Sequence, residues 1–570
     1  MKPTAEQAAI EDAGADLKPG EILKVLAFAG AGKTSTLKLV AKRKPERGVY
    51  LVFNTQNAEE ARKKLALTNC SASTTHSLAF GAMREYIGSP ANHSPSTVRE
   101  SGVMDRFSIP KVAGWNQYRL AMAVLRAVRA FSSSADEEFG HHHGVEAIIS
   151  AVGDPGRIRN REVREAAREA VERLSGVTYQ AAEAFWLEMT SQGSFSHDMY
   201  LKYIDLDANL RGQAFSMFRY LMVDEAQDLN PVQRSIILKT SLPVIAVGDP
   251  YQQIYSWRGA ENALGLMEGK ELYLTQSFRF GEDLAEIARG ILASRPDGGP
   301  EQRLTGAGSG DITRHVGARL AFVCRTNAGV IDQALSLVRK GKTPYVDNMD
   351  GLVRDVRSAQ ALFDGRLRDV KSPDLVQFTS WDEMQMEAEE GDANLARLVG
   401  IVEDNIVPQI EELASNRVKD PAKAEVAVCT AHRSKGMEWP AVVLGDDWKD
   451  IGAMRGRHRG AKKKSEKDVT LALEEWNALY VGATRAMVRL RGHERILNPP
   501  KPEFDRDAGP DGGQLEEGGN WVPEDRLIEQ EMREKRRRAQ EAREAAAAGA
   551  EMEMQSSRNW SKEDDISKFL

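Results

Sequence analysis

The chain has 570 residues and a net charge of −7, with 77 basic against 84 acidic residues. Apolar residues make up 41% and charged residues 28%, which is typical of a globular protein and excludes a fully disordered chain. No apolar stretch reaches the ~18 residues that a membrane-spanning helix needs, and the three cysteines lie too far apart for a disulfide framework. We therefore expect a cytoplasmic protein with no membrane partner. The acidic balance argues mildly against nucleic acid, although binding depends on local charge as well as on the total.

Short apolar strands alternate with helical segments along the chain. The expected strands are residues 22–28, 49–53, 220–223 and 244–247, followed by 320–324 and 441–444. Residues 81–215 between them are mostly helical in pattern. Such alternation predicts an α/β fold in which helices cover both faces of a parallel sheet. The later strands predict a second α/β lobe.

A loop of small residues follows the first strand. Residues 27–34 (AFAGAGKT) match the phosphate-binding loop pattern, except that Ala27 stands where the first glycine usually is. Small residues let backbone N–H groups surround a phosphate, and the next helix points its positive dipole end at it. Lys33 would reach the β- and γ-phosphates of ATP, and Thr34 would offer a hydroxyl to Mg²⁺. The expected ATP-binding residues of this loop are Ala29, Gly30, Ala31, Gly32, Lys33, Thr34 and Ser35.

An acidic cluster (DEAQD) follows the strand at residues 220–223. In open α/β folds ligands bind at the carboxyl ends of the strands, so Asp224 is expected to hold Mg²⁺. Glu225 is expected to orient and activate the attacking water. Acidic clusters of this kind often cap a helix when they occur alone. After a phosphate-binding loop, the cluster predicts nucleoside triphosphate hydrolysis, but not what the hydrolysis drives.

The segments that follow resemble the motifs of superfamily 1 DNA helicases of the UvrD/Rep/PcrA type. Residues 247–260 (VGDPYQQIYSWRGA) look like motif III, 275–279 (TQSFR) like motif IV, 430–439 (TAHRSKGMEW) like motif V and 479–486 (LYVGATRA) like motif VI. Residues 4–7 (TAEQ) are similar to the adenine-reading glutamine motif, and 53–54 (FN) and 74–77 (TTHS) to the Ia and Ib elements. All occur in the family's order.

A more specific likeness is to the F-box DNA helicase branch. It is carried by residues 27–30 (AFAG), 196–202 (SHDMYLK) and 475–480 (EWNALY). No room for an F-box precedes Gln7, so we expect a bacterial or phage relative without ubiquitin-ligase coupling.

The resemblance implies two RecA-like lobes and an ATP-dependent helicase or translocase that moves 3′→5′ on single-stranded DNA. It implies that Gln7 reads adenine, that Gln252 couples the γ-phosphate to the DNA site and that Glu438 contacts the ribose. Arg279 and Arg485 would act as arginine fingers, which stabilise transition-state charge. The implied catalytic set is Lys33, Asp224, Glu225, Gln252, Arg279 and Arg485. ATP and Mg²⁺ are the implied cofactors.

Single-stranded DNA and tailed duplex DNA are the expected partners. The aromatic rings of Phe53, Tyr255 and Trp257 could stack on bases, which is worth ~1–3 kcal/mol each and needs no sequence preference. Tyr255 and Trp257 could instead be core residues. The remaining expected DNA contacts are His76, Arg258 and His432.

The resemblance divides the chain into lobe 1A at residues 1–80 and 215–275, a helical insertion 1B at 81–214 and lobe 2A at 276–330 and 425–498. A reduced 2B-like insertion would occupy 331–424. Because that insertion is short, the resemblance supports duplex unwinding less strongly than translocation along a strand. The alternative is an anti-recombination remodeller that strips proteins from single-stranded DNA.

Three segments leave alternatives open. The basic segment 455–467 reads as a solvated loop or as a loop that contacts phosphates. Residues 499–570 read as a linker and a charged helical tail, which could dock a protein partner. His141, His142 and His143 could bind a metal, but adjacent histidines usually cannot all face one ion.

Overall fold

The computed structural model describes most of the chain. The described residues are 2–52, 55–84, 103, 117–152, 154–156, 161–192, 196–256, 259, 262–299, 303–310, 315–372, 374–376, 378, 380–389, 393–462, 466–498, 514–515 and 521–522. The chain forms two units, one of residues 1–402 and 407–498, the other of 403–406 and 499–570. In the second unit β14 (Gln514–Leu515) pairs with β15 (Trp521–Val522) in antiparallel fashion. None of the described helices is both long and apolar enough to cross a bilayer.

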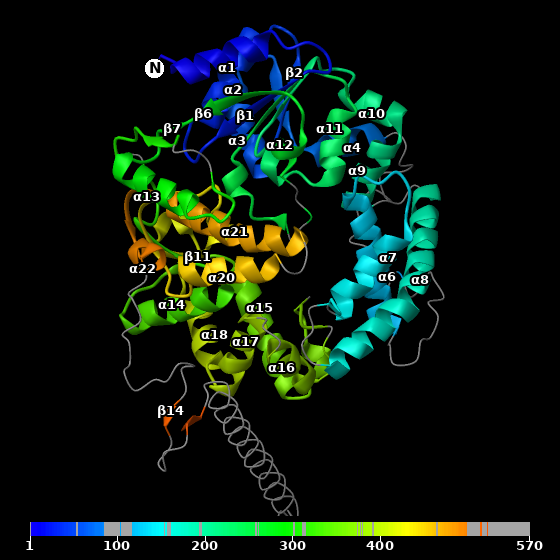
Figure 1. Ribbon diagram of the computed structural model, residues 1–570, viewed down its shortest axis with the longest axis vertical. Helices are drawn as coiled ribbons and strands as arrows, with labels where there is room; N and C mark the ends of the chain where they lie inside the picture. Colours follow the sequence, from blue (N-terminus) through cyan, green and yellow to red (C-terminus); the bar gives the residue numbers. More distant parts are fainter. Residues whose placement is uncertain are drawn as a thin grey trace, which may run out of the picture. The chain divides into compact units, whose positions relative to one another are not determined.

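A six-stranded sheet forms the N-terminal part of the first unit (Figure 1). Its strand order is β3-β2-β4-β5-β1-β6, and all neighbours are parallel. The strands are β1 (Ile22–Ala27), β2 (Gly48–Leu51), β3 (Cys70–Ser73), β4 (Tyr220–Val223), β5 (Val244–Gly248) and β6 (Lys270–Leu274). The predicted parallel α/β fold is therefore confirmed, and the predicted strands at 220–223 and 244–247 correspond to β4 and β5.

Side chains of alternate residues enter the two faces of this sheet, as strand geometry requires. Met222 of β4 packs with helices on one face, while Leu221 and Val223 pack on the other. The helices of the first face are α1 (Ala5–Ala15), α2 (Lys33–Arg43) and α3 (Thr55–Leu65). The second face is covered by α4 (Thr75–Met83), α11 (Pro231–Leu238), α12 (Ala263–Leu266) and the inserted helices. Both faces are thus buried, which explains the continuous apolar runs in the strands.

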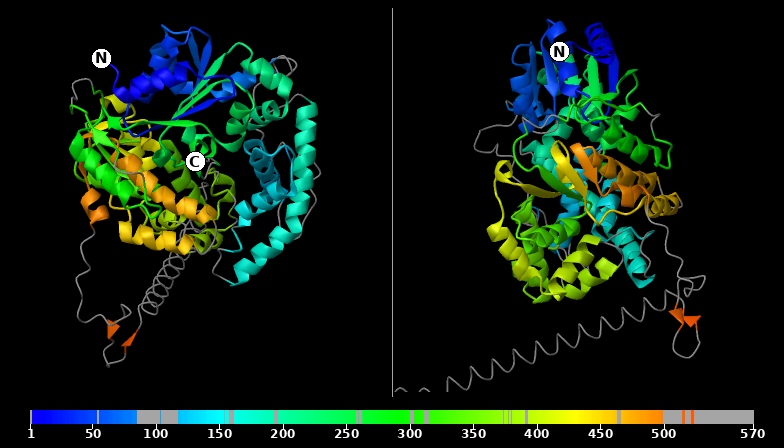
Figure 2. Two further views of the ribbon diagram at one scale, coloured as in Figure 1. Left: turned by 45° about the horizontal axis from the view of Figure 1, so that its top comes forward. Right: turned by 90° about the vertical axis from the view of Figure 1, so that its left-hand side faces the viewer.

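Where the structure describes it, the chain between β3 and β4 is mostly helical, as predicted for this region. Its described helices are α6 (Gln117–Ser133), α7 (His141–Val152), α8 (Arg161–Ser191), α9 (His197–Leu206) and α10 (Ala208–Phe215). Helices α6, α7 and α8 lie side by side (Figures 1 and 2). Aromatic contacts hold them together, including Phe131 of α6 against Trp186 of α8, whose ring centroids are 5.0 Å apart.

A second parallel sheet has the order β10-β11-β9-β12-β13. Its strands are β9 (Leu320–Cys324), β10 (Tyr345–Val346), β11 (Val426–Thr430), β12 (Trp439–Leu444) and β13 (Ala486–Arg491). Helices α13 (Glu282–Ala293), α14 (Asn327–Arg339), α19 (Ala431–Ser434), α20 (Ile451–Ala461), α21 (Glu466–Ala483) and α22 (His493–Leu497) accompany it, and β7 (Gln276–Ser277) pairs with β8 (Thr305–Gly306). The predicted second α/β lobe is therefore present.

The chain between β10 and β11 is helical where it is described. It contains α15 (Met349–Phe363), α16 (Trp381–Glu389), α17 (Ala393–Glu403) and α18 (Val407–Asn416). Short 3₁₀ turns complete the described elements, at Ala226–Asp228, Pro250–Gln252, Leu367–Asp369 and Pro421–Lys423. The predicted boundaries of the four domains stay predictions.

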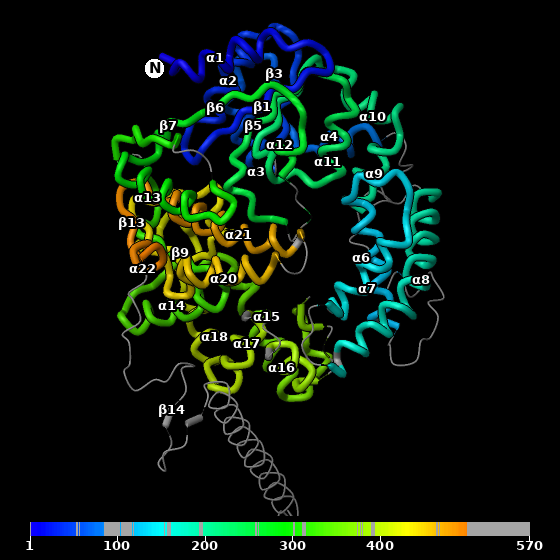
Figure 3. Tube along the Cα trace, viewed as in Figure 1, coloured from blue at the N-terminus to red at the C-terminus, as the bar shows by residue number. Residues whose placement is uncertain are grey.

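The basic segment that we predicted as a loop begins in a helix, so that prediction is wrong for residues 455–461. Helix α20 starts at the cap Asp450, whose side chain accepts a hydrogen bond from the Ala453 N–H at 2.9 Å. Met454, His458 and Ala461 recur at helical spacing and are buried. Helix α20 runs beside α21 (Figure 3). The glycines and cations of this segment make the narrow stripe of buried residues difficult to recognise in the sequence.

Candidate functional site

The small-residue loop after β1 takes a conformation that only glycine adopts easily. Gly30 and Gly32 have φ values of 74° and 77°, and Lys33 is the first residue of α2. A Cβ atom at Gly30 would lie 2.6 Å from Ser277 Oγ, and the Phe278 N–H donates to the Gly30 carbonyl at 2.9 Å. The loop is thus fastened to residues 277–278. Backbone N–H groups at the start of α2 provide a site for an anion.

Lys33 and Glu225 form the central ion pair of the site. Lys33 Nζ lies 2.5 Å from Glu225 Oε1. Burial alone would lower the pKa of Lys33, but Glu225 and Asp224 raise it. Burial would raise the pKa of Glu225, but Lys33 and Lys435 lower it to about 2. Both groups are therefore charged at neutral pH.

The backbone of Glu225 is left-handed, with φ 50° and ψ 42°. Such a conformation is uncommon for a residue with a side chain and costs of order 1–3 kcal/mol. It allows the Glu225 N–H to donate to Asp224 Oδ1 at 3.0 Å, while Gln227 Nε2 donates to Glu225 Oε2 at 2.6 Å. The strained backbone of Glu225 therefore occurs together with a Glu225 carboxylate that a hydrogen bond holds in one orientation.

Asp224 and Thr34 share a hydrogen-bonding partner, the hydroxyl of Tyr50. This hydroxyl donates to Asp224 Oδ2 and also hydrogen-bonds the Thr34 side chain. Burial and the nearby charge of Glu225 raise the pKa of Asp224, against the opposite effects of Lys33 and Tyr50. A hydroxyl and a carboxylate are the oxygen ligands that Mg²⁺ prefers, so the donor set fits the metal predicted here.

A chain of hydrogen bonds links the loop to the second sheet's helix α21. The Ala29 N–H donates to the Tyr480 hydroxyl at 3.2 Å, and that hydroxyl lies 3.2 Å from Asp249 Oδ2. Gln252 Nε2 donates to the same Asp249 oxygen at 2.7 Å. All of these contacts are buried, so they connect residues of both sheets rigidly.

The two predicted arginine fingers have different surroundings. Arg485 is 2% exposed and donates to Gln252 Oε1 at 3.1 Å. Burial and the charge of Arg279 lower the pKa of Arg485 to about 9. Arg279 donates to Glu438 Oε2 at 2.9 Å and to the Thr484 carbonyl at 2.9 Å. The structure thus brings both arginines to motif residues, with Arg279 paired to the glutamate expected at the ribose.

Gln7 lies next to the loop, with its side chain already engaged. The amide completes a capping box with Thr4 and donates to Thr36 Oγ1 at 3.3 Å. A Cβ atom at Gly32 would lie 3.3 Å from Gln7 Nε2 and 3.6 Å from the ring of Phe278, which is 41% exposed. An accessible aromatic face therefore stands beside Gln7.

Lys435, a residue for which the sequence suggested no role, connects the acidic cluster to the second sheet. Its Nζ pairs with Asp228 Oδ2, donates to the Gln252 carbonyl at 2.7 Å and lies 5.1 Å from the centre of the Tyr255 ring. Burial raises the pKa of Asp228 to about 6, although Lys435 acts against this.

A cavity of about 640 Å³ lies beside these residues. Its lining includes Tyr255, Arg325, Thr326, Asn327, Asn348, Asn394, Thr430, His432, Arg433, Arg457, Leu471, Glu474 and Glu475. The three arginines are partly neutralised. Arg325 makes two hydrogen bonds to Glu475, at 2.7 and 2.8 Å, and Arg457 pairs with the same carboxylate at 3.0 Å.

The expected DNA-contacting residues separate into three groups. Tyr255 and His432 line the cavity, and the Tyr255 hydroxyl donates to the His432 carbonyl at 3.2 Å. Tyr255 is half-buried against the hydrophobic core of the second sheet. It therefore packs against a core and also faces the cavity, which combines the two interpretations, core residue and stacking residue. His76 instead lies edge-on to Tyr200, at 6.1 Å between ring centroids. Phe53, Trp257 and Arg258 lie outside the described residues.

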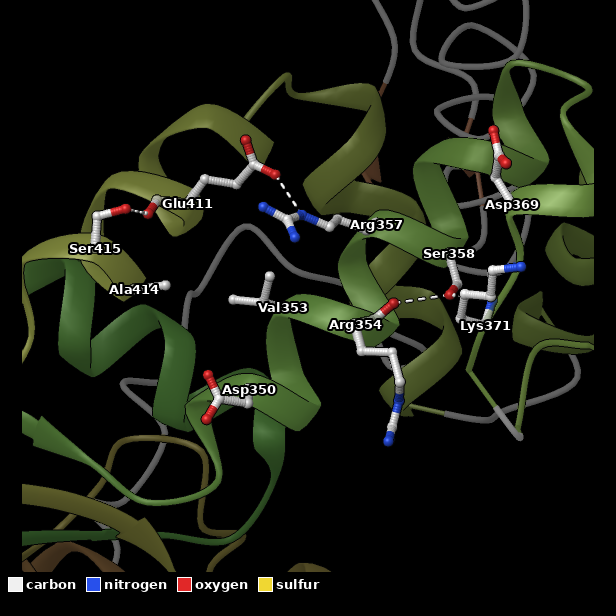
Figure 4. A pocket seen from close by; sticks show the side chains of 10 residues that line it. All are labelled: Asp350, Val353, Arg354, Arg357, Ser358, Asp369, Lys371, Glu411, Ala414 and Ser415. Carbon is white, nitrogen blue, oxygen red and sulfur yellow. Dashed lines mark hydrogen bonds and ion pairs between the residues drawn. The ribbon is translucent and has the colours of Figure 1, made fainter. Parts of the chain in front are cut away.

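A second cavity of about 470 Å³ lies between α15 and α18 and contains none of the predicted site residues (Figure 4). Cations and carboxylates alternate around it, and Arg357 donates to Glu411 at 2.6 Å. Because these charges compensate each other, it lacks the positive field that a polyanion needs.

Sequence reasoning missed several residues of the site. Tyr50 lies inside an expected strand, and Tyr480, Lys435 and Phe278 lie inside recognised motifs; none of the four had a predicted role. Arg325 directly follows the last residue of β9. A charged residue at the carboxyl end of a parallel strand often lies in a ligand site, so its position could have suggested a role. The tyrosine hydroxyls could not have been placed without knowing which strands are neighbours.

Comparisons with known proteins give one family match and several relatives. Residues 10–271 match the family model of the UvrD/REP helicase N-terminal domain. The chain is 28% identical over 503 residues to F-box DNA helicase 1 of Gallus gallus, covering 82% of this chain and 47% of that protein. It is 28% identical over 531 residues to F-box DNA helicase protein 1 of Schizosaccharomyces pombe, covering 85% and 57%.

A bacterial relative is also similar over part of its length. DNA helicase IV of Escherichia coli is 24% identical over 329 residues, which cover 48% of this chain and 45% of that protein. The chain thus spans about half the length of the curated relatives it matches. Residues 10–271 thus form a UvrD/REP helicase N-terminal domain, and the similarity to F-box and other DNA helicases is consistent with superfamily 1A.

Proposed function

We propose that the protein is an ATP-dependent DNA helicase or translocase that moves 3′→5′ on single-stranded DNA. One observation carries the proposal: the buried hydrogen-bond chain from Ala29 through Tyr480 and Asp249 to Gln252 and Arg485. It joins the phosphate-binding loop to residues of both sheets. Nucleotide chemistry at the loop is therefore mechanically connected to the second sheet.

ATP would bind at the loop after β1. The α2 N-terminus and Lys33 would bind the phosphates, and the exposed ring of Phe278 would stack on the base beside Gln7. Because Lys33 is paired with Glu225, the phosphates must compete for the lysine. Nucleotide binding would thus free the carboxylate that the reaction requires.

Glu225 would orient the attacking water and accept its proton. Its left-handed backbone and the hydrogen bond from Gln227 hold the carboxylate in place. Thr34 and Asp224 would hold Mg²⁺, which when bound neutralises charge on the phosphates. Arg485 would stabilise charge that develops on the γ-phosphate, and its link to Gln252 would report the change to the neighbouring segment.

Arg279 would join the phosphates only after leaving Glu438. In the structure the pair is closed at 2.9 Å, and Glu438 is half exposed. Exchange of a carboxylate for a phosphate partner keeps the guanidinium paired, so the exchange costs little. This step would draw Glu438 toward the ribose, as the family pattern implies.

Single-stranded DNA would pass over the cavity lined by Tyr255, Arg325 and Arg457. Backbone phosphates would compete with Glu475 for the two arginines, and the half-buried Tyr255 ring would offer a stacking face. Lys435 contacts both Tyr255 and Gln252. It would therefore connect the DNA-stacking residue to the nucleotide site.

The central test is ATP hydrolysis by the full chain with and without single-stranded DNA. We expect strong stimulation by DNA, and loss of turnover in Lys33→Ala with the fold retained by circular dichroism. Hydrolysis that single-stranded DNA leaves unchanged would contradict the translocase.

Polarity and unwinding need a second assay. Duplexes with 3′ or 5′ single-stranded tails would show whether strands separate, and we expect activity only with the 3′ tail. Removal of a protein block from a 3′-tailed strand without strand separation would favour the remodeller over the helicase.

A further inference from the structure

Two adjacent histidines and an aspartate meet at the turn between α6 and α7. His142 Nε2 lies 2.9 Å and His143 Nε2 lies 3.1 Å from the same oxygen, Asp136 Oδ2. The three ligand atoms all lie within 4.8 Å of one another. His141 does not take part, because its ring lies against Tyr179 at 6.0 Å between centroids.

One of the three atoms is buried without a hydrogen bond. His143 is 1% exposed, and its Nε2 atom has no hydrogen-bonding partner in this structure. Its other nitrogen, Nδ1, lies 3.0 Å from the Gly140 carbonyl oxygen and 3.0 Å from the Gly140 nitrogen, so the Gly140 backbone can engage Nδ1 in either tautomer. If Nδ1 carries the proton and donates to that carbonyl, the Nε2 lone pair is left facing the Asp136 carboxylate. Burial of a polar atom without a partner is destabilising, so a ligand for this atom would stabilise the fold.

We propose that Asp136, His142 and His143 form a binding site for a divalent transition metal of the zinc class. Tetrahedral Zn²⁺ with bonds of about 2.0–2.1 Å separates its ligand atoms by about 3.3 Å, close to the distances between Asp136 Oδ2 and the two imidazoles. Imidazole and carboxylate ligands suit Zn²⁺, whereas Mg²⁺ prefers oxygen alone. The exposed side of His142 and Asp136 leaves a fourth position to water.

The metal would fasten the turn that connects the α6–α7 helices to the first sheet's helices. The buried Lys202 of α9 donates to the carbonyl oxygens of Asp136 and of Ser134, the latter at 3.1 Å. Lys202 also pairs with the buried Asp205, whose carboxylate lies 3.1 Å from Lys239 Nζ at the C-cap of α11. The site therefore belongs to a charged network at the base of the helical insertion. Its role is structural and separate from the nucleotide site.

The test is zinc binding by the full chain without an affinity tag, in competition with a chromophoric chelator at pH 7.5. We expect one Zn²⁺ per chain with micromolar or tighter affinity. Asp136→Asn and His142→Ala should each weaken binding at least tenfold. His141→Ala is the matched control, because it removes a neighbouring imidazole that faces Tyr179, and it should bind as the wild type does.

A fourth variant keeps all three ligands. A Cβ atom at Gly140 would lie 2.6 Å from the His142 ring, so Gly140→Ala should displace that imidazole and weaken zinc binding. Lys33→Ala should bind zinc normally, which separates this site from the proposed ATPase. Absence of binding tighter than about 100 µM, or equal losses in His141→Ala and His142→Ala, would overturn the proposal.

Discussion

At the residue scale, the candidate site is built from ion pairs, and the proposed function requires these pairs to exchange partners. Lys33, Arg279 and Lys435 are each held by a carboxylate, and each lies where a phosphate or a DNA-facing residue would need it. Pairing removes the cost of burying isolated charges. The structure therefore holds these three cations in place through ion pairs.

Replacement of Glu225 by glutamine separates binding from turnover. Glutamine cannot accept a proton and releases Lys33, so nucleotide affinity should hold or rise while turnover falls about 10²–10⁴-fold. A fluorescent ATP analogue and a steady-state ATPase assay measure the two effects. Lys33→Ala is the contrasting variant, since it should lose both. Undiminished turnover in Glu225→Gln would remove Glu225 from the catalytic role.

His432 makes a pH-dependent contribution to stability. Burial and Arg325 lower its pKa to about 4 in the folded protein, from an ordinary value of 6.5. The unfolded chain thus binds the proton more readily between these values, so stability is lost as pH falls from about 6.5 to 4. The fall in melting temperature over that range should be smaller in His432→Asn than in the wild type. An identical fall in both would show that His432 is not responsible.

At the element scale, several helices could be read from the sequence and α20 could not. Helix α2 follows directly from the loop pattern, and β4 from an unbroken apolar run before Asp224. Helix α20 presents only Ile451, Met454, His458 and Ala461 to the core, a stripe too narrow to recognise among cations and glycines. Contacts such as Tyr480 to Ala29 join residues from opposite ends of the sequence, and no local pattern encodes such pairs.

The same helix supplies a testable DNA contact. Arg457 lines the cavity, whereas Arg459 of α20 does not. Arg457→Ala should weaken single-stranded DNA binding and reduce the slope of log affinity against log salt by about 0.7, the share of one phosphate contact. Fluorescence anisotropy at several salt concentrations measures this, with Arg459→Ala as the matched control. Equal salt slopes in the two variants would exclude Arg457 from the DNA surface.

At the scale of the whole molecule, the buried contacts of Tyr480 connect the loop after β1 to α21. Coupling between hydrolysis and movement requires such an element, because a ligand shifts conformations only through contacts that differ between them. The net charge of −7 is compatible with DNA binding, since three arginines outnumber the two glutamates in the lining of the cavity. The net charge of the chain therefore says less about DNA binding than the positions of a few cations do.

Tyr480→Phe tests this connection without changing the packing. The change leaves the buried Ala29 N–H and Asp249 without their shared partner, which costs about 1–3 kcal/mol. Denaturant unfolding should show that loss, and DNA should stimulate ATP hydrolysis less than in the wild type. Tyr345→Phe is the control for losing a hydroxyl, because the Tyr345 hydroxyl donates to Asp347 Oδ1 at 3.1 Å, away from the loop. Full stimulation in Tyr480→Phe would locate the coupling elsewhere.

The strand order of the first sheet also has a consequence for synthesis on the ribosome. Strand β1 is hydrogen-bonded on both sides by strands that begin at Val244 and Lys270, long after β1 itself is made. Pairings this distant in sequence form slowly, and an unpaired apolar strand is prone to aggregate. While the nascent chain grows, the strand that leads into the phosphate-binding loop must wait, unpaired, until residue 244 has emerged from the exit tunnel.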